Sequence, residues 1–112
     1  MTAANYNLFI DQGSDFAIQF TISESGVVKD LTGYYARAQL RSRKADTTLA
    51  ATFTCTISSP TLGKIDMSLG NSITTALTAG IYYYDLELYT ANDAIVTRLL
   101  EGQATVSQEV TR

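Results

Sequence analysis

Apolar and polar residues alternate with a period of two along most of the chain. Phe16, Ile18 and Phe20 share one parity, with small or polar residues between them, and the same alternation returns at 53–57 and 65–69. Because successive side chains of an extended strand point to opposite faces, each such segment is predicted to be a strand with one buried face.

A longer segment, 35–41, indicates which side chains face outward. Its even-numbered alanines and Leu40 are expected to face inward, which leaves Tyr35, Arg37 and Arg41 on the outer face. Small residues on the inward side indicate that a bulky side chain packs opposite them. The outer face of this strand is therefore predicted to carry an aromatic ring and positive charge.

The segment 80–89 carries three consecutive tyrosines followed by alternating acidic residues. Burying the unpaired carboxylates of Asp85 and Glu87 would cost several kcal/mol, so the odd-numbered positions are expected to face solvent. The even-numbered positions, Tyr82 among them, then fill the core. Of the three tyrosines, only Tyr83 is expected on the surface.

Gly, Asn, Asp and Ser residues separate these segments and are predicted to form the turns between them. The segment 71–77 is the one helical candidate, with Asn71 as its cap and Gly80 beyond its end. Eight or nine short strands with one short helical turn predict an all-β fold, an antiparallel immunoglobulin-like β-sandwich of about eight strands. The Cys-Trp-Cys core of antibody domains is missing, because the chain has one Cys and no Trp.

The length and the composition of the chain indicate a single domain. The chain has 112 residues, of which 46% are hydrophobic and 17% charged, and this suits a single globular domain over residues 1–112. Its net charge of −3 argues against nucleic-acid binding, since such domains usually carry a positive excess. No apolar run approaches the ~20 residues of a membrane helix, so no membrane contact is expected. The N-terminus does not resemble a signal peptide.

Common active-site chemistry is hard to assemble from this sequence. Histidine is absent, and the single cysteine, Cys55, is expected to be a small core residue. Asp11 and Asp15 flank a turn, where a calcium site is the alternative to simple turn chemistry. Asp85 and Glu87 share one strand face, where a glycosidase pair is the alternative to a solvated surface. We predict a non-enzymatic protein with no catalytic residue, no metal and no cofactor.

A basic cluster is the one local asymmetry of charge. Arg37 and Arg41 share an outer strand face beside Tyr35, and Arg43 and Lys44 follow in the next loop. One interpretation is a soluble face that discourages pairing of strand edges. The other is a docking patch for an acidic partner, since Arg and Tyr are favoured interface anchors.

Large apolar residues of both parities occur at 95–100, where Leu99 and Leu100 are adjacent. A strand of this kind is either central in its sheet or covered on its outer face by another chain, so self-association is a hypothesis. The N-terminal segment 1–10 is expected either to pair within its own sandwich or to dock on or exchange with a neighbour. The candidate interface residues are thus Tyr35, Arg37, Arg41, Arg43 and Leu99.

Three segments carry a family resemblance. They are DQGSDF at 11–16, LTGYYARAQLR at 31–41 and AGIYYYDLELYTANDAIVTRLLEGQATVSQEVTR at 79–112. Together they resemble small virion structural proteins of tailed bacteriophages, including cyanobacterial phages. Similar segments occur in immunoglobulin-like N-terminal modules of phage baseplate and tail proteins.

The resemblance implies a structural role in the tail, baseplate or neck of the particle, without catalysis or cofactor. It implies synthesis in the bacterial cytoplasm and incorporation into the virion, with other virion proteins as partners and a homo-oligomer or several copies per particle. One alternative is a carbohydrate- or receptor-binding sandwich on the virion, for which Tyr34, Tyr83 and Tyr89 are the candidate rings. A head decoration protein is the other.

Overall fold

The computed structural model describes residues 3–111. Four of its strands are only two residues long, which is why the structure has more strands than the predicted eight or so. The helix α1 spans Asn71–Ala76, and the 3₁₀ turns η1 and η2 span Pro60–Leu62 and Ala91–Asp93. The strands are β1 (Ala4–Asn5), β2 (Leu8–Asp11), β3 (Phe16–Thr21), β4 (Ser23–Glu24), β5 (Val27–Val28), β6 (Tyr35–Arg41), β7 (Ala51–Thr52), β8 (Thr54–Ser59), β9 (Lys64–Leu69), β10 (Gly80–Tyr89) and β11 (Val96–Ser107).

The large sheet has the strand order β1-β11-β10-β6-β7, and β2 also pairs with β11. β10 pairs antiparallel with both β11 and β6. β1 and β2 instead run parallel to β11, with Ala4 opposite Leu100 and Leu8 opposite Ala104. Within the segment 1–10, the N-terminal strand therefore pairs with its own chain from residue 4 onward, and residues 1 and 2 lie outside the described residues.

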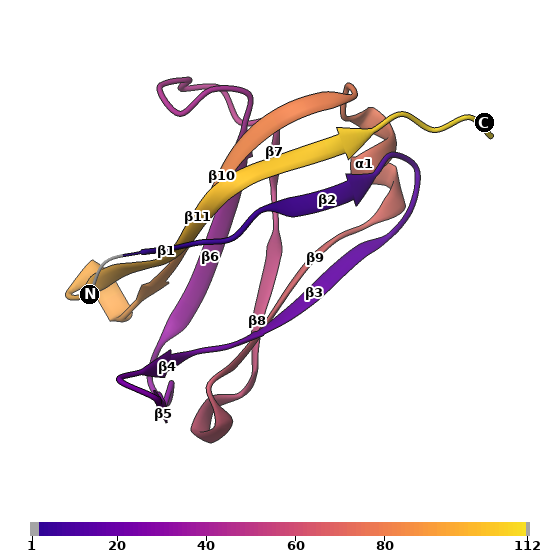
Figure 1. Cartoon of the computed structure of the whole chain (residues 1–112). Helices are drawn as coiled ribbons and strands as arrows, with labels where there is room; N and C mark the ends of the chain where they lie inside the picture. The colour runs from indigo at the N-terminus through magenta and orange to yellow at the C-terminus, as the bar shows by residue number, and fades with distance from the viewer. Residues whose placement is uncertain (1–2, 112) are drawn as a thin grey trace.

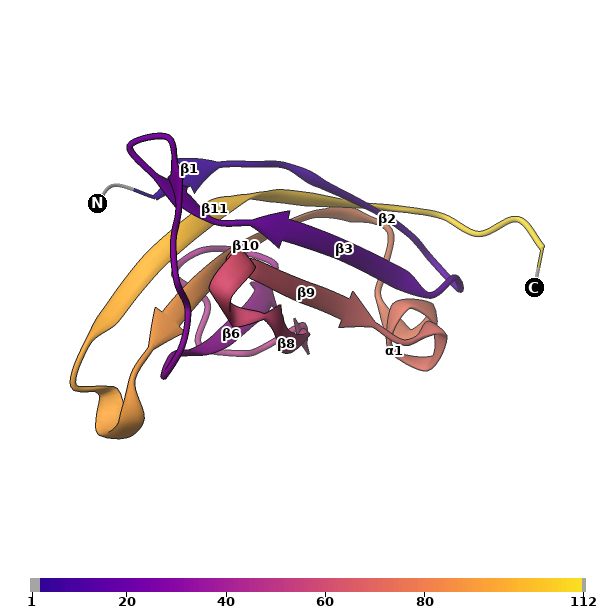
Figure 2. The ribbon, with the colours of Figure 1, turned by 90° about the horizontal axis from the view of Figure 1, so that it is seen from below.

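The small sheet has the order β3-β9-β8, with antiparallel pairing throughout. Figure 1 shows it packed across the large sheet, and Figure 2 shows the two layers from below. The β4–β5 hairpin lies at one end of the sandwich and α1 at the other (Figures 1 and 2). This arrangement confirms the predicted all-β sandwich.

The core between the two layers contains the side chains that the alternation placed inward. Tyr82 and Tyr84 are buried and Tyr83 is only half-buried, as predicted. Burying one large aliphatic side chain contributes about 1.5–3 kcal/mol, so this core supplies most of the stabilisation. The buried apolar residues are Leu8, Ile10, Ile22, Leu31, Ala38, Leu40, Ala51, Phe53, Ile65, Met67, Leu69, Leu77, Tyr82, Tyr84, Leu86, Leu88, Leu99, Leu100, Ala104 and Val106.

The helix α1 is held by the turn that precedes β3. Gly70 occupies its N-cap, and Asp15 Oδ1 accepts hydrogen bonds from the backbone and side-chain amides of Asn71, at 2.8 and 3.0 Å. The hydroxyl of the fully buried Thr74 donates to the Ser14 carbonyl at 2.8 Å. The prediction that Asn71 caps the helix is therefore wrong, because a carboxylate from a distant turn accepts the free amide.

The N-terminal strand passes over Gly102 at the break between β1 and β2. A Cβ at Gly102 would overlap the carbonyl oxygen of Tyr6. The same oxygen accepts a hydrogen bond from the hydroxyl of buried Tyr84 at 2.5 Å. The side chain of Asn7 accepts another from the Gln103 amide at 3.1 Å. The absence of a side chain at Gly102 therefore fixes where the N-terminal strand lies.

A β-bulge interrupts the pairing of β10 with β11. Leu86 lies opposite Leu100 and Glu87 lies opposite Arg98, so Leu99 is the extra residue. The bulge allows both leucines to be buried within the chain, and Leu99 is 4% exposed. The hypothesis that Leu99 contacts another chain is therefore wrong, because its side chain belongs to the core of its own chain.

Candidate functional site

The outer face of the large sheet, formed by β2, β11, β10 and β6, holds most of the predicted interface residues. The register of the strands arranges its side chains in five rows. From the α1 end to the η2 end the rows are Phe9–Thr105–Ile81, Gln103–Tyr83–Arg41, Glu101–Asp85–Gln39, Arg98–Glu87–Arg37 and Val96–Tyr89–Tyr35. Apolar side chains thus occupy both ends of this face, and the charged ones lie between them.

Arg37 is held by neighbours on three sides. Its Nε donates to Glu87 Oε1 at 2.9 Å, and its Nη1 donates to Asp93 Oδ1 at 3.3 Å. Its guanidinium lies 4.4 Å from the ring centroid of Tyr89, which in turn packs 5.5 Å from the ring of Tyr35. The hydrogen bond to Glu87 is the main reason that the pKa of Arg37 is raised. The charge of Arg37 is therefore balanced within the chain.

Arg98 bridges two carboxylates, that of Asp85 on the neighbouring strand β10 and that of Glu101 on its own strand β11. Its Nε lies 3.3 Å from Asp85 Oδ2, and its Nη1 donates to Glu101 Oε2 at 3.3 Å. Partial burial nevertheless raises the pKa of Asp85 above 3.8, and the nearby Glu87 acts in the same direction while Arg98 opposes both. The ionised form of Asp85 is therefore less favourable in the folded protein than in the unfolded chain.

Replacing Asp85 with asparagine is expected to change how stability depends on pH. A raised folded-state pKa means that the stability tied to protonated Asp85 is present at low pH and is lost as pH rises through that pKa. The free energy of unfolding of Asp85→Asn, minus that of the unaltered protein, should therefore increase between about pH 3 and about pH 7. Urea unfolding at both pH values measures the difference, and a decrease would contradict the assigned cause.

The other basic residues of the predicted cluster lie where β6 leads into the following loop. Arg41 donates from Nη2 to Gln39 Oε1 at 3.0 Å and from Nη1 to the Asp46 carbonyl at 3.1 Å. Arg43 is 80% exposed, and its Nε lies 3.9 Å from Asp46 Oδ2. The structure therefore brings Tyr35, Arg37 and Arg41 together on one face and places Arg43 in the adjoining loop.

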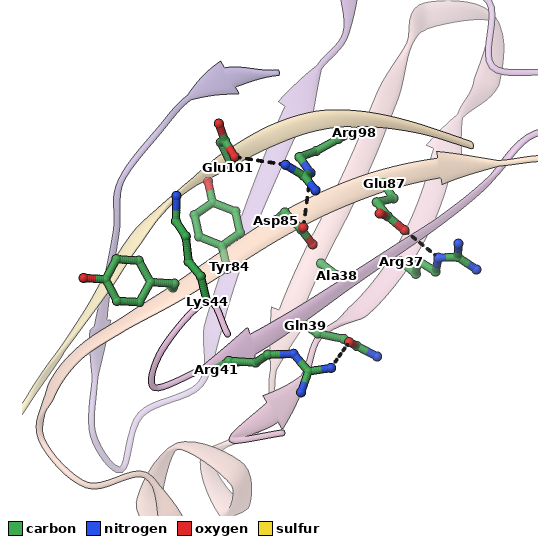
Figure 3. Close-up of a pocket in the computed structure, with 11 residues that line it drawn as sticks. Arg37, Ala38, Gln39, Arg41, Lys44, Tyr84, Asp85, Glu87, Arg98 and Glu101 are labelled. Carbon is green, nitrogen blue, oxygen red and sulfur yellow. Dashed lines mark hydrogen bonds and ion pairs between the residues drawn. The ribbon is translucent and has the colours of Figure 1, made fainter. Parts of the chain in front are cut away.

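A hollow of about 550 Å³ lies in the charged middle of this face (Figure 3). Lys44 contributes to its wall, with Nζ 6.0 Å from the ring centroid of Tyr83. Figure 3 shows the contacts of Arg98 with its two carboxylates and, separately, the contact of Arg41 with Gln39. Such an arrangement of cations, carboxylates and a tyrosine ring suits the binding of charged groups on a partner.

The apolar row at the α1 end was not among the predicted interface residues. Phe9 is 75% exposed and Ile81 is 56% exposed, and Thr105 lies between them. A signal for Phe9 was present, because Leu8, Phe9 and Ile10 are three apolar residues in succession. A strand with alternating faces can bury only two of the three, so the third has to lie outside.

The tyrosines considered for carbohydrate binding do not gather at one end of the sandwich. Tyr34 is half-buried, and Lys29 Nζ lies 5.3 Å from its ring centroid. Tyr83 and Tyr89 stand in different rows of the outer face, opposite Arg41 and Tyr35 respectively. The rings are therefore separated and do not form a common stacking platform.

The residues considered for catalysis or metal binding are partly buried or take part in contacts that stabilise the fold. Cys55 is half-buried, and burial raises its pKa to about 11, so the thiol stays protonated near neutral pH. Asp11 accepts a hydrogen bond from the Ser107 hydroxyl at 2.9 Å, which joins β2 to β11. Among residues 3–111, no group of three or more Cys, Asp or Glu side chains could hold a metal ion.

Comparisons with known proteins bear on the fold. No family model matches the chain, and no curated protein matches it. Among solved structures, the chain is similar to the crystal structure of the cysteine protease inhibitor EhICP2 from Entamoeba histolytica. The TM-score is 0.51 and the sequence identity is 15%, and the match covers 93% of this chain and 88% of that chain. At this identity the similarity shows the all-β sandwich fold alone.

Residues 3–111 contain no helix that could cross a membrane. None of the helical segments there has both the length and the apolar character that a transmembrane helix needs. The only α-helix described, α1, spans six residues, whereas a membrane helix needs about 20.

Proposed function

We propose that this protein is a non-enzymatic structural module of a tailed bacteriophage virion and that it binds other virion proteins through the outer face of the large sheet. The observation that carries the proposal is the exposure of large apolar side chains on this face. Phe9, Ile81 and Tyr35 are 75%, 56% and 55% exposed. Exposed aromatic and aliphatic side chains beside arginines are typical of surfaces that other proteins cover.

The outer face of the small sheet lacks the large apolar side chains that are exposed on the large sheet, as far as the described residues show. In the described residues of β3, β8 and β9, its outward positions carry only small or polar side chains, and such a face suits contact with water. The contrast therefore favours the large sheet as the binding side of the sandwich. The outward residues of the small sheet are Ala17, Gln19, Thr21, Thr54, Thr56, Ser58, Lys64, Asp66 and Ser68.

The sequence resemblance supports the choice of partner. The segments at 11–16, 31–41 and 79–112 resemble those of tail and baseplate proteins of phages. Under this proposal the chain is made in the bacterial cytoplasm and is carried in the particle in several copies, as symmetric assemblies require. Other virion proteins cover the apolar rows at the two ends of the outer face.

A double variant on the outer face tests the proposal. Phe9→Ser with Tyr35→Ser removes one large side chain from each apolar row, and it should leave the fold intact because both side chains are largely exposed. In particles purified from cultures infected by a phage that encodes the chain, mass spectrometry should detect the unaltered protein. The double variant should be depleted at least about tenfold, as expected when two interface anchors are lost.

The matched control removes two exposed apolar side chains elsewhere. Val27→Ser with Leu62→Ser alters the β4–β5 hairpin and η1, away from the outer face, and should be incorporated normally. If the unaltered chain is absent from the particles, the virion role is wrong. If the Phe9 and Tyr35 double variant is incorporated at the normal level, the outer face is not the binding surface.

A further inference from the structure

We infer that Arg41, Lys44 and Tyr83 form a docking point for an acidic, extended segment of the partner protein. The inference rests on the proposed function, because it assigns the chemistry of the partner at the same face. It follows from which cations on this face are balanced within the chain and which are not.

Most charges around the hollow are already paired. Arg98 contacts Asp85 and Glu101, and Arg37 contacts Glu87. Each carboxylate that lines the hollow thus has a cation of the same chain beside it. A basic partner would have to displace an arginine to reach any of these carboxylates, so this face is poorly suited to bind one.

Arg41 is held in place by hydrogen bonds, but no carboxylate of the described residues neutralises its charge. Its two hydrogen bonds go to neutral acceptors, the side-chain oxygen of Gln39 and the backbone carbonyl of Asp46. Among residues 3–111 no carboxylate forms an ion pair with Arg41, and its electrostatic effect on Asp85 is the weakest of those acting on that group. A guanidinium held in place by neutral groups keeps its charge available and loses little freedom when an anion binds.

Lys44 adds a second positive charge near the same tyrosine. Tyr83 lies directly opposite Arg41 in the strand register, and Lys44 Nζ lies 6.0 Å from the ring of Tyr83. No carboxylate of the described residues pairs with Lys44. Two cations that pair with no carboxylate of the described residues therefore lie near one partly exposed ring, a combination that recognises carboxylates attached to a chain with some apolar surface.

The surroundings of this point indicate how the segment lies. Ile81 precedes Tyr83 by two residues on the same face of β10, and Phe9 stands in the row of Ile81. An extended segment along this line would place an apolar side chain over Phe9 and Ile81 and its acidic side chains beside Tyr83. The apolar row and the cations would then act on a single bound strand or loop.

The test is a binding titration at low ionic strength, in which NMR monitors the chemical shifts of the backbone amides. The probe is the capped peptide acetyl-(Glu-Gly)₃-amide, with acetyl-(Gln-Gly)₃-amide as the uncharged comparison. We expect saturable shifts at residues 41–44 and 83 with the acidic peptide only. The variant Arg41→Gln with Lys44→Gln should weaken binding about tenfold, the effect of losing two exposed ion pairs.

A matched control loses the same two positive charges from other positions. Lys29→Gln with Lys64→Gln removes one charge next to the β4–β5 hairpin and one from the small sheet, and it should bind the acidic peptide nearly as well as the unaltered protein. If this control loses binding as strongly as the Arg41 and Lys44 variant, the attraction is a property of net charge and the docking point is wrong. Tighter binding of oligothymidylate than of the peptide at the same residues would also overturn the assignment.

The test of the docking point and the test of the virion role can fail independently of each other. If Arg41→Gln with Lys44→Gln is incorporated into particles normally while Phe9→Ser with Tyr35→Ser is not, the virion role stands and the acidic partner is wrong. If the peptide binds as expected but the chain is absent from particles, the docking point stands and the virion role is wrong.

Discussion

Replacing Gly102 with alanine is expected to destabilise the protein by about 2–4 kcal/mol. The added Cβ would overlap the carbonyl oxygen of Tyr6 and stand 2.9 Å from its carbonyl carbon, so the N-terminal strand would have to move away from β11. This movement would also take the acceptor away from the buried hydroxyl of Tyr84. Urea unfolding measures the loss. Hydrogen exchange at the Tyr6 amide, which donates to the Glu101 carbonyl at 2.9 Å, reports on the strand itself.

Gly70→Ala is the matched control for this substitution. No heavy atom lies within 4 Å of a Cβ at Gly70, and its φ of −71° is open to any residue. It should lose less than about 1 kcal/mol, the usual cost of replacing glycine at a helix N-cap. Equal losses in the two variants would show that the contact of Gly102 with Tyr6 is not what the strand depends on.

Leu99→Ala is expected to lower the free energy of unfolding by about 2–5 kcal/mol. The reason is that the side chain is 4% exposed within the single chain, so its removal leaves a cavity. The loss should be the same at low and high protein concentration, because no second chain is involved. Unfolding curves across a hundredfold range of concentration measure it.

Val96→Ala provides the comparison on the same strand. Val96 is exposed, and its truncation should change stability by no more than about 0.5 kcal/mol. A loss in Leu99→Ala that appears only at high concentration would restore the hypothesis that Leu99 contacts another copy. A full loss at every concentration would support its place in the core.

The fold could be predicted from the sequence where one rule, period-two alternation, acts alone. The strands that carry Phe16, Ile65 and Tyr82 follow it, because a strand buried on one face has no other way to divide apolar from polar residues. The bulge at Leu99 could not be predicted in this way. One extra residue shifts the parity, and an apolar pair then has the same sequence signature as a strand covered by a second chain.

The candidate site was predicted in part. Tyr35, Arg37 and Arg41 are two and four residues apart along one strand, and these even spacings predict from the sequence that they share a face. Whether each arginine is paired with a carboxylate does not follow from the sequence of this strand. The partners of Arg37 lie elsewhere, because Glu87 comes from another strand and Asp93 from the turn after it. The distinction between a balanced Arg37 and an unbalanced Arg41 depends on the register of β6 against β10, which the sequence of either strand leaves open.

The parallel pairing of β1 and β2 with β11 has a mechanical consequence. Tension applied through the residues that precede β1 and follow β11 pulls these neighbouring strands in opposite directions along their length. The hydrogen bonds between them are then strained in shear and have to give way together, whereas strands pulled apart from one end would separate one bond at a time. A domain joined to its neighbours at these two points would therefore bear load without opening its core first.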